Sequence, residues 1–178
     1  MAIELLKGMS TTHLYRHDLE SLFYIMLLTT TRHTISPTKG GVVMREGIRP
    51  YQEWFDEQRY SALANHKRAF LSFEDPIDLS PAFESFRPWL KQMKDVFSNG
   101  FDYKKSHLRK QVNEQEKQKR AGGSASGVTS VAAPFDDETL GGHVDYSTIV
   151  ESSRDLEGEL EGLVIRYETP ISVIQADG

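Results

Sequence analysis

The sequence predicts a mainly α-helical domain followed by a disordered C-terminal tail. Before residue 110, apolar residues recur at three- and four-residue intervals, and this part holds both tryptophans and all five methionines. From residue 111 onward Gly, Ser and charged residues dominate, and a segment so poor in large apolar groups cannot offset the entropy of ordering itself. We therefore predict a folded part over 1–110, with no convincing strand, and a charged linker and largely disordered tail over 111–178.

Composition excludes several classes of protein. The chain has no cysteine, which excludes disulfides and cysteine-ligated metal centres. The formal net charge of −5 is mild, so we expect neither a nucleic-acid nor a membrane partner. No apolar run reaches the length of a membrane span, and the N-terminus lacks a secretory signal pattern. These features predict an intracellular protein, cytoplasmic or nuclear.

The strongest predicted helix covers residues 12–30. It is apolar nearly all round, which is typical of a helix buried in the middle of a domain. Thr11 or Thr12 is the expected N-cap. At helical spacing Asp18 falls between Leu14 and Leu22 on an apolar stripe, where a carboxylate is costly unless a partner pairs with it.

The remaining elements follow from periodicity and from helix-breaking residues. Residues 31–50 contain several Gly and Pro and are predicted to be a long loop, followed by a short helix over 51–57 and an amphipathic helix over 60–72. A last helix is predicted to open at Ser80 or Pro81, to kink or split at Pro88 and to stop at Asn99–Gly100.

Two stretches of the sequence resemble motifs from the C-lobe of protein kinases. The stretch HDLESLFYIML is similar to the D-x-W-S-L-G opening of the long central helix, with Asp18 and Ser21 in register, and closer still to the casein kinase I-like D-L-E-S-L-G-Y. Upstream, MAIELL resembles the A-P-E-L-L that closes an activation segment, with Ala2 and Glu4 in register and Ile3 in place of proline. With FDDETLGG, the chain is most similar to the fungal-type protein kinase family, and the specific resemblance covers residues 1–30.

The resemblance implies a partial kinase C-lobe, made of the helices that follow the activation segment. In that family the aspartate matching Asp18 accepts hydrogen bonds from backbone N–H groups of the catalytic loop. The glutamate matching Glu4 forms a buried ion pair with an arginine late in the lobe, for which Arg87 and Arg109 are both open. A full-length parent would transfer the γ-phosphoryl group of ATP to hydroxyl groups of a protein substrate, with Mg²⁺.

The motifs that carry this chemistry are absent from the 178 residues. There is no Gly-rich phosphate loop, no strand lysine, no H-R-D loop and no D-F-G. We therefore expect no catalytic residue, no bound ATP or metal and no activity from this chain alone. Without the donors of the missing N-terminal kinase segment, a buried Asp18 would cost roughly 1–3 kcal/mol and leave the fragment soft.

Two explanations remain open at this point. Met1 is either an internal methionine of a longer kinase or the true start of a non-catalytic helical interaction protein. The second explanation places a partner-binding apolar surface at Phe83, Phe86 and Trp89. A reading frame upstream of Met1 that carries H-R-D and D-F-G would favour the first.

Three further patterns have ordinary interpretations. His13 and His17 are the one histidine pair at helical spacing, a weak zinc candidate without an acidic third ligand at useful spacing. The basic run over 104–120 is typical of the exposed end of a helix, with a nuclear-import segment as the alternative. The acidic stretch FDDETLGGHVD, 135–145, is predicted to be solvated.

Overall fold

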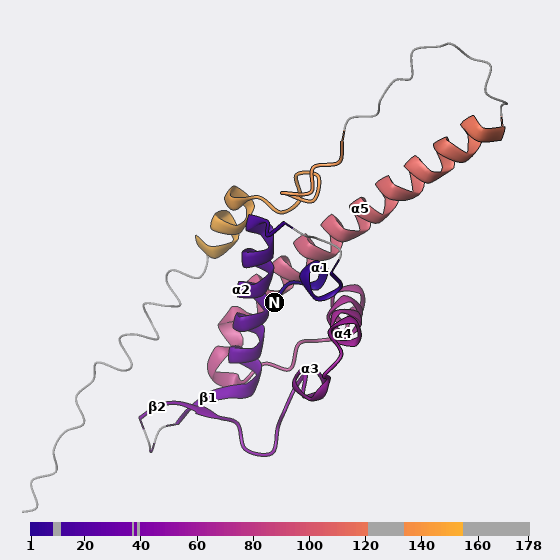
Figure 1. Ribbon diagram of the computed structural model, residues 1–178. Coiled ribbons are helices and arrows are strands. Elements are labelled where there is room, and N and C mark those ends of the chain that lie inside the picture. The colour runs from indigo at the N-terminus through magenta and orange to yellow at the C-terminus, as the bar shows by residue number, and fades with distance from the viewer. Residues whose placement is uncertain (9–11, 37, 39, 121–133, 155–178) are drawn as a thin grey trace, which may run out of the picture.

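A computed structural model describes residues 1–8, 12–36, 38, 40–120 and 134–154, and it confirms the predicted mainly α fold (Figure 1). The elements in order are α1 (Ile3–Leu6), α2 (Tyr15–Arg32), β1 (His33–Ser36), β2 (Gly41–Met44), α3 (Glu53–Asp56), α4 (Tyr60–Ser72), the 3₁₀ helix η1 (Pro81–Phe86) and α5 (Arg87–Arg120). A last helix covers 146–154. Among the described residues, none of the helices combines the length and the hydrophobicity that a membrane span requires.

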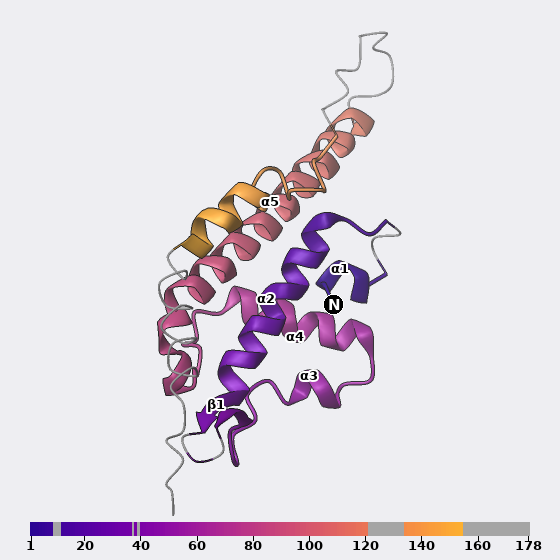
Figure 2. The ribbon, with the colours of Figure 1, turned by 90° about the vertical axis from the view of Figure 1, so that its left-hand side faces the viewer.

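Helices α2 and α5 run in opposite directions (Figure 2), and together they supply nine of the 21 buried residues of the hydrophobic core. The ring of Phe23 on α2 lies 5.6 Å from that of Phe97 on α5. Leu27 and Leu90 are fully buried beside them. One face of the first long helix therefore packs into the core, but the helix is not buried all round as predicted, because Leu22 and Ile25 on its other face are exposed.

The smaller helices α3 and α4 cover one side of this pair through an aromatic cluster. Trp54 of α3 packs its ring against those of Tyr24 and Phe70, at 5.4 and 5.7 Å between centroids. Tyr51 lies against both Trp54 and Phe70. Edge-on arrangements of this kind stabilise a core beyond their buried area.

The predicted loop over 31–50 contains a β-hairpin, so the expectation of no strand in this region was wrong. Strands β1 and β2 pair antiparallel, with Thr34 opposite Val43 and Ile35 opposite Val42. These four β-branched residues favour extended backbone, and Gly41 at φ 120° completes the turn. Each strand has only four residues, too few for a recognisable alternation.

Helix α5 does not stop at Asn99–Gly100, contrary to the sequence prediction. The predicted split near Pro88 is confirmed, because η1 gives way to α5 at Arg87 and Pro88 lies in the first turn, where its missing N–H costs nothing. Gly100 lies within α5, and a Cβ atom there would approach Leu140 to 3.0 Å. The glycine therefore permits a close packing contact and does not end the helix.

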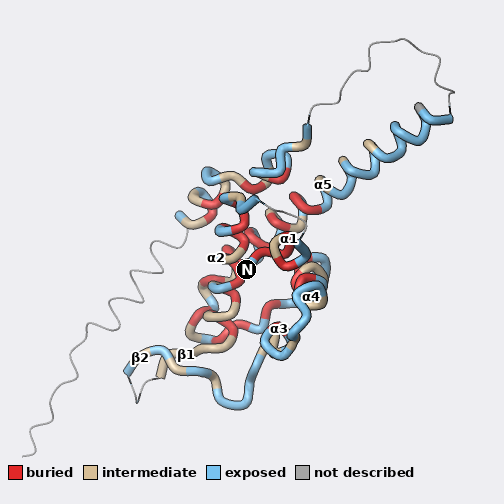
Figure 3. The backbone as a smooth tube through the Cα atoms, in the orientation of Figure 1, coloured by how far each residue is buried: buried red, intermediate tan, exposed pale blue. Residues whose placement is uncertain are grey.

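The segment over 134–154 is packed on the body of the protein, although the sequence predicted a largely disordered tail there. Leu140 and Val144 are fully buried and Ile149 nearly so, and the burial map shows this segment against α2 (Figure 3). Gly141, at φ 72°, lies so close to the ring of Tyr103 that a side chain would collide with it. The rest of the predicted tail, 121–133 and 155–178, lies outside the described residues.

Candidate functional site

A buried ion-pair network joins α1, α2 and α5 at Glu4. Arg16 Nη2 lies 2.5 Å from Glu4 Oε2, and Lys104 Nζ donates to Glu4 Oε1 at 2.9 Å. Arg16 and Glu4 are both buried, so each charge requires the other. Burial alone would raise the pKa of the Glu4 carboxyl, but the hydrogen bonds from Lys104 and Arg16 outweigh it and hold that pKa below its ordinary value.

The partners of Glu4 are therefore neither of the two arginines considered from the sequence. Arg87 donates to Glu84 and to the carbonyl oxygen of Ile77 instead. Arg109 lies on the exposed side of α5. The arginine that pairs with Glu4 is Arg16, in the first turn of α2 and only twelve residues away in the sequence. The ion pair therefore does not require an arginine from later in the chain.

The acidic segment predicted to be solvated completes the same network. Lys104 contacts Asp137 as well as Glu4, and the Arg16 guanidinium donates to the carbonyl oxygen of Asp137. The carboxylate of Glu138 accepts the Tyr15 N–H at 2.9 Å, at the positive N-terminus of α2. Residues 135–138 therefore act as a cap and a latch on α2.

His17 provides the other contact at the start of α2. Its Nδ1 accepts the Leu14 N–H at 3.1 Å, so neither Thr11 nor Thr12 is the N-cap residue. The ring is fully buried, and this burial lowers the pKa of His17 and favours the neutral form. His13 stays exposed, 3.5 Å from Asp18 Oδ1. The described residues contain no group of metal-ligating side chains that could hold an ion.

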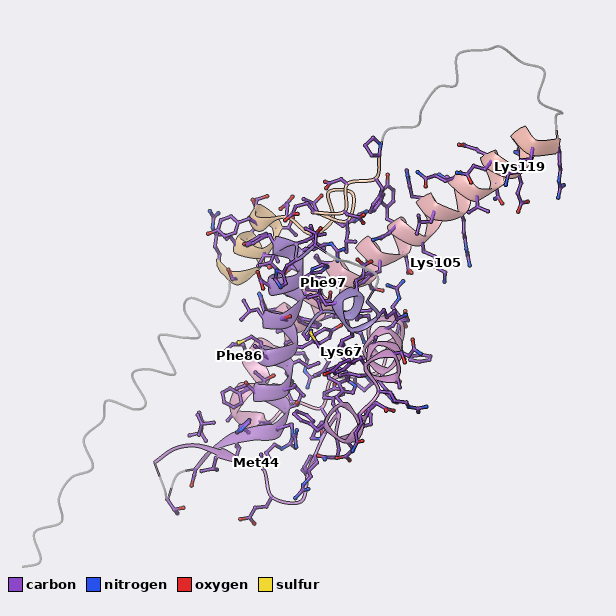
Figure 4. All side chains as sticks on the ribbon, in the orientation of Figure 1. Met44, Lys67, Phe86, Phe97, Lys105 and Lys119 are labelled. Carbon is purple, nitrogen blue, oxygen red and sulfur yellow. The ribbon has the colours of Figure 1, made fainter. Side chains whose placement is uncertain are left out.

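A second buried carboxyl, that of Glu20, lies on α2 one turn after Arg16. Its Oε1 accepts the Ile3 N–H at 2.9 Å, which fixes α1 against α2. Burial raises the pKa of Glu20 to about 7, although the Ile3 N–H and the nearby charge of Lys67 favour the ionised form. Lys67, which is labelled in Figure 4, lies on α4. It donates to the carbonyl oxygen of Met1 and lies 4.0 Å from the centroid of the Tyr24 ring. Burial lowers the pKa of Lys67 to about 8.

Asp18 does not lie on a buried stripe. Its side chain is 66% exposed, and the same face of α2 leaves Leu22 47% and Ile25 59% exposed. The buried face lies elsewhere around the helix and carries Arg16 and Glu20. Because Asp18 is in water, the desolvation cost and the soft fold expected from its burial do not apply.

The five residues that match kinase sequence motifs differ in how far they are buried. Ala2, Ile3 and Glu4 are buried at the start of the chain, Ser21 is half-buried and Asp18 is exposed. The apolar surface predicted at Phe83, Phe86 and Trp89 does not exist, because all three side chains are buried in the core.

Sequence reasoning missed the charged residues that α2 buries. Arg16 and Glu20 are four positions apart and continue at helical spacing into Phe23, Tyr24 and Leu27, all of them buried. The sequence signal that could have revealed this burial is the oppositely charged pair Arg16 and Glu20, which lies on the same side of the helix as Phe23, Tyr24 and Leu27. Lys67, Lys104 and Asp137 carried no such local signal, because their partners are distant in the sequence.

Comparison with known proteins finds a similarity at the start of the chain. Residues 1–30 match the family model described as fungal protein kinase. Neither a curated protein nor a solved structure matches the chain. The matched residues contain α1 and nearly all of α2, and therefore include Glu4, Arg16, Asp18 and Glu20.

Proposed function

We propose that this chain is the C-terminal helical part of the C-lobe of a fungal-type serine/threonine protein kinase. The family match over residues 1–30 supports the assignment. The observation that carries it is the two-sided character of α2, whose buried face holds the core while Asp18, Leu22 and Ile25 remain exposed. A catalytic segment of the parent packs on that face, with its backbone N–H groups donating to Asp18.

In this proposal the chain contributes a platform and no chemistry of its own. Ala2, Ile3 and Glu4 correspond to the end of the activation segment, and the Glu4 network holds them against α2. ATP and Mg²⁺ bind to the N-terminal kinase segment of the parent, whose sequence motifs these 178 residues lack. The chain alone binds no ATP, and its first partner is that missing segment.

The test compares Asp18→Ala in two contexts. The native message is read upstream of Met1, and an in-frame chain carrying H-R-D and D-F-G is produced in full length. There Asp18→Ala is expected to lower kcat on a peptide substrate at least about tenfold, since it removes the anchor of the catalytic loop. In the 178-residue chain the same change is expected to shift the free energy of unfolding by no more than about 0.5 kcal/mol, because the side chain is exposed.

Asp95→Ala, at an exposed aspartate of α5, is the matched control and is expected to change neither quantity. An upstream frame without these motifs would overturn the proposal. Saturable ATP binding by the 178-residue chain in a calorimetric titration would also contradict it.

The exposed face of α2 supports one alternative, a non-catalytic helical interaction module. In that case Leu22 and Ile25 contact a partner protein that is not a kinase segment. The upstream reading frame separates the two, because only the kinase proposal requires catalytic motifs there.

A further inference from the structure

A groove between α1, the second half of α4 and the middle of α5 holds an apolar stripe that the protein covers only in part. The groove has a volume of about 710 Å³, and its wall includes Phe101, Leu108 and Val112 at helical spacing on one side of α5. Phe101 is buried, whereas Leu108 is 46% and Val112 53% exposed. The burial map shows why, because α5 continues past the body of the protein (Figure 3). Among the described residues, nothing covers the second half of this stripe.

Three exposed cations lie beside the apolar stripe. Lys7, Lys105 and Arg109 all line the groove. Within the part of the chain that the structure describes, no carboxylate lies within ion-pair distance of any of them. Their charges are therefore available to a ligand.

The other charged groups of the groove neutralise one another. Arg68 pairs with Asp102 at 3.2 Å, and Lys104 pairs with Glu4 at 2.9 Å. Glu4, the carboxylate in the lining, also pairs with Arg16. The groove therefore keeps the positive charge of its three exposed cations, and this charge favours an anionic ligand.

The arrangement of these residues fits a helix as the ligand. On α5, Lys105 and Arg109 follow one edge of the apolar stripe, four residues apart. When two helices pack, apolar residues at three- and four-residue intervals form the seam, and the charges that flank the seam select a partner of opposite charge. From Phe101 to Val112 the stripe is roughly 16 Å long, about three helical turns.

We propose that this groove binds an acidic amphipathic helix of a partner protein. The apolar residues of that helix pack on Leu108 and Val112, and its carboxylates pair with Lys7, Lys105 and Arg109. The proposal does not rest on the kinase assignment, because no residue of α2 lines the groove.

Other occupants match the groove less well. A second copy docking through the same stripe would bring the cations of both copies together, and such a like-charge contact is unfavourable. Nucleic acid would use the cations through its phosphates but would leave Leu108 and Val112 without an apolar partner. A flat membrane surface does not fill a concave groove.

A synthetic peptide of known composition tests the proposal on the full chain. The probe is a fluorescein-labelled peptide of about 15 residues of Glu, Ala and Leu, with leucines at three- and four-residue intervals. Fluorescence anisotropy is expected to show saturable binding that weakens at least about tenfold from 0.1 to 1 M salt, because the Debye length shortens from about 10 to about 3 Å. The same peptide with Gln for every Glu, or with Ala for every Leu, is expected to bind at least about tenfold more weakly.

Charge reversal at the rim provides the decisive comparison. Lys105→Glu with Arg109→Glu is expected to weaken peptide binding at least about tenfold and to leave the melting temperature unchanged, because both side chains are exposed. Lys117→Glu with Lys119→Glu is the matched control, on the same helix but outside the groove, and is expected to leave binding intact. Figure 4 labels Lys105 near the body of the protein and Lys119 near the end of α5.

A second pair of variants tests the apolar stripe. Leu108→Gln with Val112→Gln is expected to weaken binding by a similar factor and to leave the fold intact, because both side chains are exposed. Val42→Gln with Met44→Gln, exposed apolar residues of β2, is the control and is expected to have no effect on binding.

The proposal is overturned if the peptide does not bind, or if its affinity survives charge reversal at 105 and 109. Duplex DNA or phosphatidylserine vesicles that bind more tightly than the peptide, and lose binding in the same charge-reversed protein, would assign the groove to another class of partner. A dimer that forms in the parent and is lost in that variant, as measured by light scattering, would assign it to a second copy. Either result would contradict the proposal.

Discussion

Glu4 and Glu20 show that the surroundings of a carboxyl, and not its residue type, decide its behaviour. Both are buried in the contact between α1 and α2. Two cations outweigh the effect of burial at Glu4, so its pKa falls. Burial raises the pKa of Glu20 to about 7, because the Ile3 N–H and the charge of Lys67 do not offset it. Near neutral pH the first carboxyl is therefore ionised, and the second is close to half-protonated.

Glu20→Gln is expected to stabilise the protein at pH 8 and to have little effect at pH 4.5. The folded state keeps a proton on Glu20 that the unfolded state releases above the ordinary pKa of 4.5, so the free energy of unfolding falls as the pH rises from 4.5 to about 7. A pKa difference of this size corresponds to a loss of roughly 3 kcal/mol in the free energy of unfolding. The Glu20→Gln protein does not lose it, because the amide side chain does not titrate. Thermal unfolding of both proteins across this range measures the difference. Glu53→Gln, at an exposed glutamate of α3, is the control, and a Glu20→Gln difference that stays flat with pH would contradict the prediction.

At the scale of the element, α5 shows why a helix end can be misjudged from sequence. Asn-Gly is a common stop signal, yet α5 passes through it and continues to Arg120. A glycine inside a helix costs about 1 kcal/mol relative to alanine. Here the absence of a side chain lets Leu140 and His143 pack against α5, so tertiary contact offsets the weak local preference.

Gly100→Ala is expected to destabilise the protein, although alanine is the better helix former. The added Cβ would meet Leu140 atoms at 3.0 Å and the Cβ of His143 at 3.3 Å, forcing the segment over 134–154 away from α5. We expect a loss of about 1–3 kcal/mol in the free energy of unfolding, the usual cost of overpacking. Chemical denaturation measures it. Asn99→Ala, one residue away and exposed, is the control and is expected to leave stability equal or higher. A stabilised Gly100→Ala protein would show that the contact is not tight.

At the scale of the whole molecule, the fold is closed at one end by residues from the far end of the chain. Glu138 caps α2, and Asp137 joins Lys104 in the Glu4 network. The exposed face of α2 has no such cover among the described residues. Leu22 and Ile25 therefore expose apolar area that a partner, or another copy of the chain, can bury.

Replacing Leu22 and Ile25 together by Gln is expected to weaken self-association and to leave the free energy of unfolding within about 0.5 kcal/mol, because both side chains are exposed. Light scattering at matched concentrations measures the association, and thermal unfolding measures the stability. Val42→Gln with Met44→Gln is the matched control, since these side chains of β2 are 53% and 55% exposed. If both pairs reduced association equally, the face of α2 would have no special role.

The sequence alone determined the mainly α character, the presence of the long helix α2 and the split before Pro88. These features depend on local periodicity and on the backbone limits of proline, which act over a few residues. The match of residues 1–30 to the fungal protein kinase family model likewise depends on a short local stretch of the sequence.

Only the tertiary structure decided which face of α2 is buried. A helix that is apolar nearly all round has no local signal for its orientation, and Arg16 and Glu20 could be buried because α1 brings Glu4 and the Ile3 N–H to them. The packing of the segment over 134–154 could not be predicted either, because its few apolar side chains are stabilised by contacts with the rest of the fold and not by their own propensity. Contacts across 100 residues, as between Lys104 and Glu4, depend on the fold as a whole.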